Sequence, residues 1–189
     1  MPDIVVVYHS GYGHTQRMAQ AVAQGAGARL LAIDADGNLP PGGWEQLQAA
    51  DAIVFGSPTY MGNVSWQFKK FADASSRPWY AQEWKDKIAA GFTNSAGMSG
   101  DKQGTLTALF TLAMQHGMIW IGRGERPGQP NGVNRLGSWG GVMAQPLNDS
   151  ADIVPEDKLT GELLGRRVAT FALKHKRASQ TPEFAGTRA

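Results

Sequence analysis

The stretch SGYGHT, residues 10–15, places hydroxyl and imidazole groups beside two glycines. It follows the apolar run IVVVY and precedes QRMAQAVAQGAG, whose small and apolar residues recur at helical spacing. The free N–H groups and the dipole of a helix N-terminus favour an anion. Because the loop holds no lysine or arginine, it suits a monophosphate better than a triphosphate. The alternative is that Ser10 or Thr15 only caps the helix.

The two familiar glycine-rich phosphate motifs do not match this loop. GYGHTQ has Gln16 where a dinucleotide fingerprint needs its third glycine, and no lysine makes it a P-loop. A single phosphate bound by backbone amides and hydroxyls is the interpretation that remains.

Two further loops have a composition suited to binding a ligand. GSPTYMGNVS, residues 56–65, combines exposed backbone with flat or polarisable side chains, on which a planar ring could lie. SAGMSG, residues 95–100, lets backbone amides approach a ligand closely because glycine and alanine carry no bulk. The alternative is that these loops are ordinary turns. However, three long loops of small residues at one sheet edge are more than is needed to join strands to helices.

Alternating strands and helices position these loops. The apolar runs predict strands, and the helical patterns between them predict helices. The expected strands are 4–8, 29–34, 51–56, 87–92 and 118–122, and the expected helices are 15–26, 44–50, 64–74, 105–116 and 155–176, with an irregular segment at 123–150. This alternation predicts an α/β fold, a three-layer α/β/α sandwich around a five-stranded parallel sheet. The three loops then meet at the carboxyl edge of the sheet, where such folds bind ligands.

The composition argues against several kinds of site and partner. We expect one domain over residues 1–176 and a flexible polar tail at 177–189. The absence of cysteine excludes disulfides and a thiolate nucleophile, and His9 and His14 lack a third ligand, so we expect no metal. A net charge of +2 without a basic stripe argues against a nucleic-acid partner. Lacking a signal peptide or a membrane-spanning run, the protein is expected to be cytoplasmic, without membrane insertion.

Four segments together resemble a known family. YHSGYGHT, GSPTYMGNVSWQ, SAGMSG and QHGM occur in the order of the FMN-binding loops of the flavodoxin-like family of WrbA-type NAD(P)H:quinone oxidoreductases. The resemblance extends from Asp3 to about Lys174. It implies a flavodoxin-like strand order 2-1-3-4-5, FMN as cofactor and NADH or NADPH as hydride donor. It also implies two-electron reduction of a quinone or similar flat acceptor, and assembly as a homo-oligomer, either a dimer or a tetramer.

The resemblance also assigns residues to roles. The FMN phosphate would be cradled by Ser10, Tyr12, Gly13, His14 and Thr15. The isoalloxazine ring would lie along Pro58, Thr59, Tyr60, Met61, Gly62 and Asn63, and its other edge would contact Ser95, Ala96, Gly97, Met98 and Ser99. His116 would stand beside the flavin as the catalytic residue and donate a hydrogen bond to a flavin or quinone oxygen. Trp79 would line the substrate space.

The roles of His116 and Trp79 each have a purely structural alternative. A histidine in the last turn of a helix, as at His116, is favoured by the helix dipole alone, and Trp79 could pack locally. The resemblance departs at Tyr60 and Met61, where the family motif PTRFGN has arginine and phenylalanine. The sequence therefore leaves open the electrostatic environment of the flavin and the way in which the nicotinamide docks.

Two other functional classes stay open. One is a flavodoxin that carries single electrons between protein partners, although such carriers are usually acidic and this chain has a net charge of +2. The other is a binding module without flavin on the same scaffold, because a fold does not dictate a function. The sequence does not distinguish NADH from NADPH and does not name the acceptor.

Overall fold

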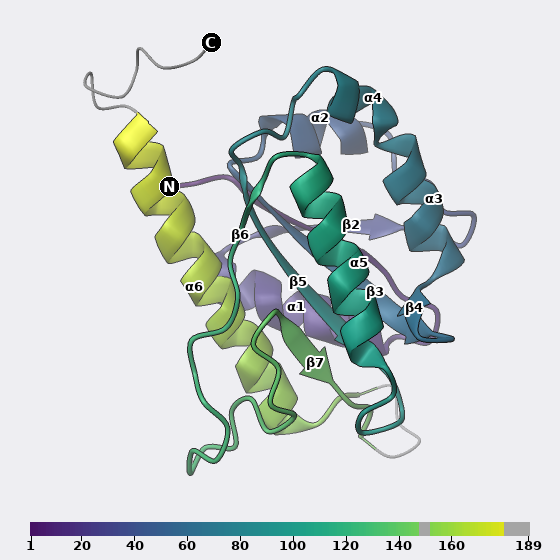
Figure 1. The fold of residues 1–189 in the computed structure, drawn as a ribbon, viewed down its shortest axis with the longest axis vertical. Coiled ribbons are helices and arrows are strands. Elements are labelled where there is room, and N and C mark those ends of the chain that lie inside the picture. Colours follow the sequence, from purple (N-terminus) through teal and green to yellow (C-terminus); the bar gives the residue numbers. More distant parts are fainter. Residues whose placement is uncertain (148–151, 180–189) are drawn as a thin grey trace.

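A parallel sheet forms the middle layer of the fold (Figure 1). The computed structural model describes residues 1–147 and 152–179. The described strands are β1 (Ile4–His9), β2 (Arg29–Ile33), β3 (Ala52–Tyr60), β4 (Asn63–Val64), β5 (Ile88–Asn94), β6 (Ile119–Trp120) and β7 (Val142–Ala144). The described helices are α1 (His14–Ala26), α2 (Gly43–Ala49), α3 (Trp66–Ala74), α4 (Ser76–Tyr80), α5 (Lys102–Gln115) and α6 (Pro155–Ser179). None of them is long and apolar enough to cross a membrane.

The main path of the sheet runs β2-β1-β3-β5-β6, with these neighbours parallel. Counting β5 and β6 as the fourth and fifth strands, this is the predicted order 2-1-3-4-5. The central strands β1, β3 and β5 are buried because helices cover both faces of the sheet, which fits the apolar runs in their sequences. The predicted flavodoxin-like fold is therefore confirmed.

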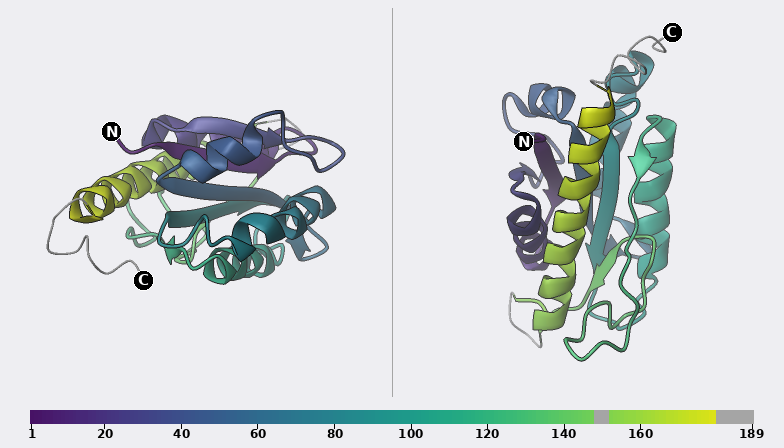
Figure 2. Two further views of the ribbon diagram at one scale, coloured as in Figure 1. Left: turned by 90° about the horizontal axis from the view of Figure 1, so that it is seen from above. Right: turned by 90° about the vertical axis from the view of Figure 1, so that its left-hand side faces the viewer.

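Helices cover both faces of the sheet (Figure 2), and each face carries its own hydrophobic cluster. Alternate residues of a strand face opposite sides. Val6 and Tyr8 of β1 pack with side chains of α1 and α6, whereas Val5 and Val7 pack with side chains of α2, α3 and α5. These two clusters make the three predicted layers.

The fifth position of the sheet is split between two short strands. β6 pairs with Ile88 and Ala89 at the start of β5, and β7 pairs with Phe92 to Asn94 at its end. The intervening segment 121–141 leaves the sheet and returns, closed by a hydrogen bond of 2.8 Å from Arg123 N to Trp139 O. The sequence predicted one strand at 118–122 and an irregular region beyond it. Only three residues of β7 pair, too few to give a periodic signal.

Two predicted features of the second loop region differ in the structure. β3 continues to Tyr60 and turns back through Met61 and Gly62 into antiparallel β4, so a hairpin replaces the expected open loop. Met61 and Gly62 have φ of 48° and 77°, as a tight two-residue hairpin turn requires. Ser65 caps α3 by accepting a hydrogen bond of 3.3 Å from Phe68 N, so the helix expected at 64–74 begins at Trp66.

The C-terminal helix α6 lies closely against α1. A Cβ on Gly165 would come within 2.1 Å of Val22 O, and a Cβ on Gly25 within 2.0 Å of Glu162 O. Glycine at these positions therefore sets the distance between the two helix backbones. α6 extends past the domain boundary expected at residue 176 and ends at Ser179, while residues 180–189 of the expected tail lie outside the described residues.

Candidate functional site

The three loops leave the sheet at one edge because β1, β3 and β5 are adjacent and parallel. They lie toward the lower end of the molecule in Figure 1. Each loop also contacts another. A Cβ on Gly11 would come within 2.5 Å of the Tyr60 hydroxyl, and one on Gly62 within 3.7 Å of the Asp101 Cβ. The loops therefore converge on one region at the carboxyl edge.

The first loop ends at the N-terminus of α1. Gly13, with φ of 91°, is the N-cap residue and provides no side-chain cap. Ser10 Oγ instead accepts a hydrogen bond of 3.1 Å from Gln16 N. The capping role left open for Ser10 is thus present in this structure. The Tyr12 side chain is 77% exposed at the rim of the loop.

Two threonines assigned to the site turn their hydroxyls inward. Thr15 Oγ1 donates to Asn94 Oδ1 at 2.6 Å, which ties the start of α1 to the end of β5. Thr59 Oγ1 lies 2.8 Å from the hydroxyl oxygens of both Thr93 and Thr105. Both threonines are buried, so they offer a ligand their backbone atoms and not their hydroxyls.

Tyr60 links the second loop to the first. Its ring meets Tyr12 edge to face, with centroids 6.4 Å apart and an interplanar angle of 75°. Burial, and secondarily Tyr12, raises the pKa of Tyr60, which keeps its phenol neutral. The hairpin tip beyond it is open, because Met61 is fully exposed. Asn63 Oδ1 is occupied by a bond of 2.8 Å from Val64 N.

A buried histidine lies behind the first two loops. His9, at the end of β1, has its Nδ1 2.8 Å from Ser65 Oγ, and Ser65 N donates to Ser57 Oγ at 3.0 Å. Burial lowers the pKa of His9, so the imidazole is neutral near pH 7. The network joins β1, β3 and the start of α3 without placing a charge beneath the loops.

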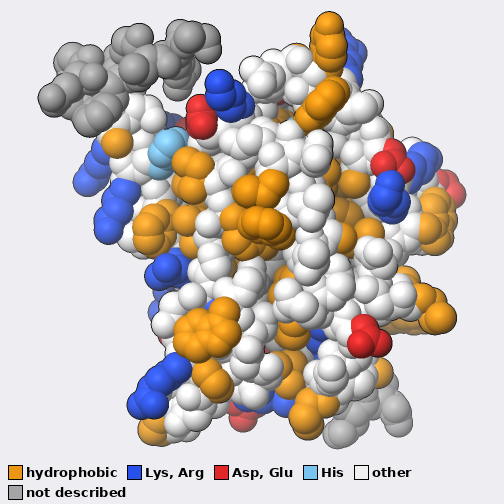
Figure 3. Space-filling view, viewed as in Figure 1, with side chains coloured by type: hydrophobic (Ala, Val, Ile, Leu, Met, Phe, Trp, Pro, Cys, Tyr) orange, Lys and Arg blue, Asp and Glu red, His pale blue; other side chains and the backbone are white. Residues whose placement is uncertain are grey.

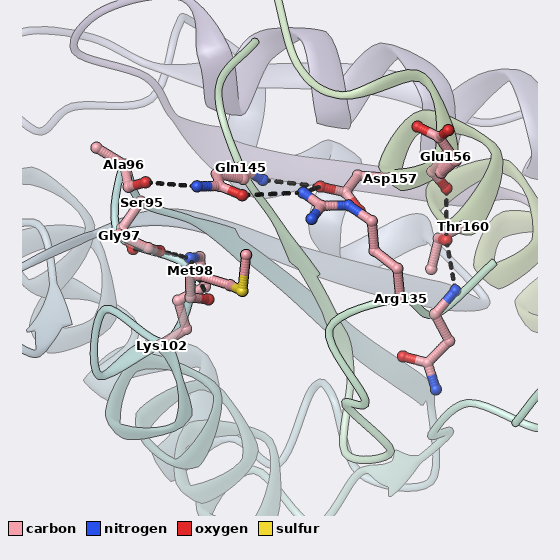
Figure 4. A network of polar contacts seen from close by, with 11 residues as sticks. Ser95, Ala96, Gly97, Met98, Lys102, Arg135, Gln145, Glu156, Asp157 and Thr160 are labelled. Atoms are coloured by element: carbon pink, nitrogen blue, oxygen red, sulfur yellow. Dashed lines mark hydrogen bonds and ion pairs between the residues drawn. The ribbon is translucent and has the colours of Figure 1, made fainter. Parts of the chain in front are cut away.

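The third loop is held by side chains from two other elements (Figure 4). Lys102 Nζ donates to Gly97 O and, at 3.1 Å, to Met98 O. Gln145 Nε2, just after β7, donates to Ala96 O at 2.9 Å. The loop residues 96–100 are exposed. The side of the loop that faces the interior is thus fixed while its other side is open.

Gln145 is in turn fixed by a partly buried ion pair. Asp157 of α6 accepts two bonds from Arg135, of 3.0 and 2.8 Å, and one of 2.9 Å from Gln145 N. Arg135 NH2 also donates to Gln145 Oε1 at 3.1 Å. Burial raises the pKa of Asp157 although Arg135 opposes that shift.

His116 and Trp79 lie at the opposite edge of the sheet. α5 runs back from the loop edge for 14 residues, about 21 Å, before it reaches His116. There His116, Trp79, Tyr80 and Met114 line a pocket of about 380 Å³. Within one chain, the structure therefore does not bring His116 or Trp79 to the three loops.

The hydrogen bonds of His116 define its tautomer. Ser75 Oγ donates to Ala72 O at 2.6 Å, so its 2.8 Å contact with His116 Nε2 uses the Nε2 proton. Burial lowers the pKa of His116 to about 4, which keeps the ring neutral. Nδ1 is then an acceptor, and within the described residues it has no partner. The only N–H of His116 already serves Ser75, so the donor expected of His116 is engaged within its own chain in this structure.

The donor set at the loop edge fits a flavin mononucleotide. A helix N-terminus with a glycine cap suits a phosphate. The small residues of 95–100 and the neutral ring of Tyr60 leave room for a flat, uncharged ring system. Gly11 leaves room for the Tyr60 hydroxyl, which would have to move if residue 11 carried a side chain.

Comparison with known proteins gives three agreeing results. The profile of the family described as NADPH-dependent FMN reductase matches residues 44–127. Flavodoxin FldP of Pseudomonas aeruginosa is 49% identical over 89% of this chain and 96% of its own length. A WrbA-like flavodoxin from Agrobacterium tumefaciens, known as a crystal structure, is 52% identical with a TM-score of 0.79, covering 93% of this chain and 99% of that one. The chain belongs to the WrbA-type flavodoxin-like family.

A second relative supports the same WrbA-type assignment. The NAD(P)H dehydrogenase (quinone) of Archaeoglobus fulgidus is 33% identical over 92% of this chain and 99% of its own length. The resemblance inferred from the four loop motifs is thus confirmed. This WrbA-type chain differs from the family motif at Tyr60, where a neutral ring contacts Tyr12 in place of an arginine.

Four residues that support the loops of the candidate site in this WrbA-type chain were not predicted from the sequence. Asn94, Lys102, Gln145 and Asp157 hold the loops from behind. Asn94 directly precedes the SAGMSG loop. A polar residue at the end of an apolar strand could have indicated its role from the sequence. Lys102 and Asp157 sit in first helical turns, where charged residues are common. Gln145 follows a strand too short to predict.

Proposed function

We propose that the protein is an FMN-dependent oxidoreductase that transfers hydride from NADH or NADPH, through FMN, to a quinone or similar flat acceptor in a two-electron reduction. The observation that carries this proposal is the convergence of three loops at the glycine-capped N-terminus of α1. The relatives named NAD(P)H dehydrogenase (quinone) support the choice of donor and acceptor.

The residues at the loop edge would bind and orient the cofactor. Ser10, Tyr12, Gly13 and His14, with the backbone of Thr15, would hold the phosphate. Residues 58–63 would flank the ring, and residues 95–99 would direct N–H groups at its other edge. Bound FMN would supply the chemistry by accepting a hydride and passing two electrons on. No protein nucleophile is needed for this reaction.

We further propose that the active form is a homo-oligomer, in which the pocket of one copy covers the FMN of another. His116 and Trp79 lie too far from the loops of their own chain to reach that flavin. Exposed apolar side chains on α5, β6 and the 121–141 segment support an interface (Figure 3), namely Phe110, Met114, Ile119 and Trp139. In such an assembly the pocket wall that contains His116 and Trp79 would line the substrate space above that flavin.

A single-electron carrier is the second candidate, because the relative with 49% identity is named a flavodoxin. The two candidates differ in their response to pyridine nucleotides. An oxidoreductase is reduced directly by NADH or NADPH, whereas a carrier needs a partner reductase.

Anaerobic spectroscopy of the FMN-loaded protein distinguishes these functions. We expect stoichiometric NADPH or NADH to bleach the flavin absorbance, and an added benzoquinone to restore it. Bound flavin that neither nucleotide reduces would favour the carrier. Light scattering on the same sample tests the assembly, for which we expect a dimer or tetramer, and a monomer that retains full quinone reductase activity would contradict it.

A further inference from the structure

The third loop turns three successive carbonyl groups toward the protein interior. Gln145 Nε2 holds Ala96 O, and Lys102 Nζ holds Gly97 O and Met98 O (Figure 4). In a trans peptide the C=O and the following N–H point in opposite directions, and the described residues contain no cis peptide. The N–H groups of the three residues that follow these carbonyls, 97–99, therefore point away from the interior.

These outward N–H groups are available to a ligand. Across residues 1–147 and 152–179, no acceptor is paired with the N–H of Gly97, Met98 or Ser99. The loop is exposed, and its glycines allow close approach. A row of N–H donors fits a ligand edge that carries carbonyl oxygens, as the pyrimidine edge of a flavin does.

Lys102, which orients the peptide groups of the third loop, lies where a positive charge is unfavourable. Lys102 is 0% exposed and is the first residue of α5, where the helix dipole disfavours positive charge. Burial lowers the pKa of Lys102 to about 8, Asp157 of α6 opposes the shift, and Arg135 of the 121–141 segment adds to it. A methionine could fill the same space without these costs. Packing therefore does not account for the ammonium.

We propose that Lys102 is a positioning residue for FMN: its ammonium holds the Gly97 and Met98 carbonyls inward, so that the N–H groups of Met98 and Ser99 face the flavin. Gln145 extends this hold to Ala96. This inference rests on the proposed function, because it assumes that FMN is the ligand of the loop.

The test compares Lys102→Met with a matched control at the other edge of the sheet. Lys87 also uses its ammonium to bind two carbonyls, those of Leu47 and Gln48, and burial also lowers its pKa. Lys87→Met therefore removes a similar group that is far from the loops. FMN dissociation constants of the full chain are measured by flavin fluorescence at pH 7 and pH 9.

We expect Lys102→Met to bind FMN at least ~10-fold more weakly than the wild type at pH 7, since charged donors make the stronger hydrogen bonds. The wild type and Lys87→Met should both lose affinity as the pH rises through about 8, because the Lys102 ammonium loses its proton there. Lys102→Met should lack this pH-dependent loss. A general structural role would not remove a pH dependence in one variant alone.

Other outcomes overturn the inference in distinguishable ways. Equal FMN affinity and equal pH dependence in Lys102→Met and the wild type would show that Lys102 does not position the cofactor. No FMN binding by the wild type would refute the proposed function, and the inference with it. If Lys102→Met does not fold, Gln145→Leu decides, with weaker FMN binding than the wild type expected and unchanged binding contradicting the inference.

Discussion

The ring of Tyr60 meets the ring of Tyr12 edge to face, with centroids 6.4 Å apart. This contact joins the loop after β3 to the loop after β1, and the Tyr60 hydroxyl occupies the space that any side chain at Gly11 would need. One neutral side chain thus fixes the spacing of two loops, at a position where the family motif has an arginine. The phosphate end and the ring end of the candidate site depend on each other through this pair.

Removing this ring should weaken FMN binding. We expect Tyr60→Ala to raise the FMN dissociation constant by about 2- to 10-fold, because aromatic pairs contribute about 0.5–1.5 kcal/mol beyond their buried area. Tyr60→Phe keeps the ring contact and should bind within a factor of about 2 of the wild type. Titrations followed by flavin fluorescence measure both variants. Unchanged affinity in Tyr60→Ala would contradict a linking role for the ring.

The bond between Thr15 and Asn94 should contribute to stability. Thr15→Val keeps the shape but leaves the buried Asn94 Oδ1 unpaired, so we expect a loss of about 1–3 kcal/mol in the free energy of unfolding. Thr107→Val changes an exposed threonine of α5 and should alter it by less than about 0.5 kcal/mol. Urea denaturation compares the two, and equal stabilities would refute the buried bond.

The order of the sheet could be predicted because β1, β2, β3 and β5 each contain a mostly apolar segment that is followed by a helical pattern. The hairpin at Met61 and Gly62 could not, since its return strand β4 has only two residues. The split of the fifth position depends on long-range pairing of β7 with β5, which local periodicity does not report. Helix α4 was missed because a proline at its third position concealed a single turn.

The contact between α1 and α6 should not tolerate a methyl group. In Gly165→Ala the new Cβ would lie 2.1 Å from Val22 O and 2.8 Å from Ala26 N, both backbone atoms that cannot easily move. We expect a net loss of about 1–3 kcal/mol from overpacking, despite alanine's better helix propensity. Gly140→Ala, which would meet nothing within 4 Å, should leave the unfolding free energy nearly unchanged. Thermal unfolding measures both variants. Equal shifts of the unfolding temperature in the two variants would argue against close packing at Gly165.

Acid should destabilise the protein through His116. Its pKa is lowered to about 4 in the fold, whereas an unfolded histidine titrates near 6.5. Between these values the unfolded chain binds the extra proton, so stability is complete above pH 6.5 and falls as the pH is lowered toward 4. The loss is at most about 3 kcal/mol.

His116→Gln removes this titration and keeps a side-chain donor for Ser75. Its unfolding free energy should therefore fall less steeply between pH 6.5 and 4 than that of the wild type. Denaturant curves at several pH values give both slopes. Parallel slopes would mean that His116 is protonated in the folded state.

The sequence pointed to candidate site residues only where they lie in the loops themselves. Ser10 to Thr15 and residues 95–99 could be proposed from the sequence because their loops directly follow predicted strands. Lys102 and Gln145 act from behind the loop, and nothing in their local sequence shows which carbonyls they bind. His116 was assigned to the flavin by a motif, but its helix carries it to the far edge of the sheet.

The most direct test of the account is a comparison of FMN with riboflavin, which lacks the phosphate. Titration of the flavin-free protein with each compound, followed by fluorescence, gives two dissociation constants. If the first loop and the N-terminus of α1 hold a phosphate, FMN should bind at least ~100-fold more tightly than riboflavin, since several charge-assisted hydrogen bonds are lost. Equal affinities, or no binding of FMN, would contradict a phosphate site at SGYGHT and with it the proposed function.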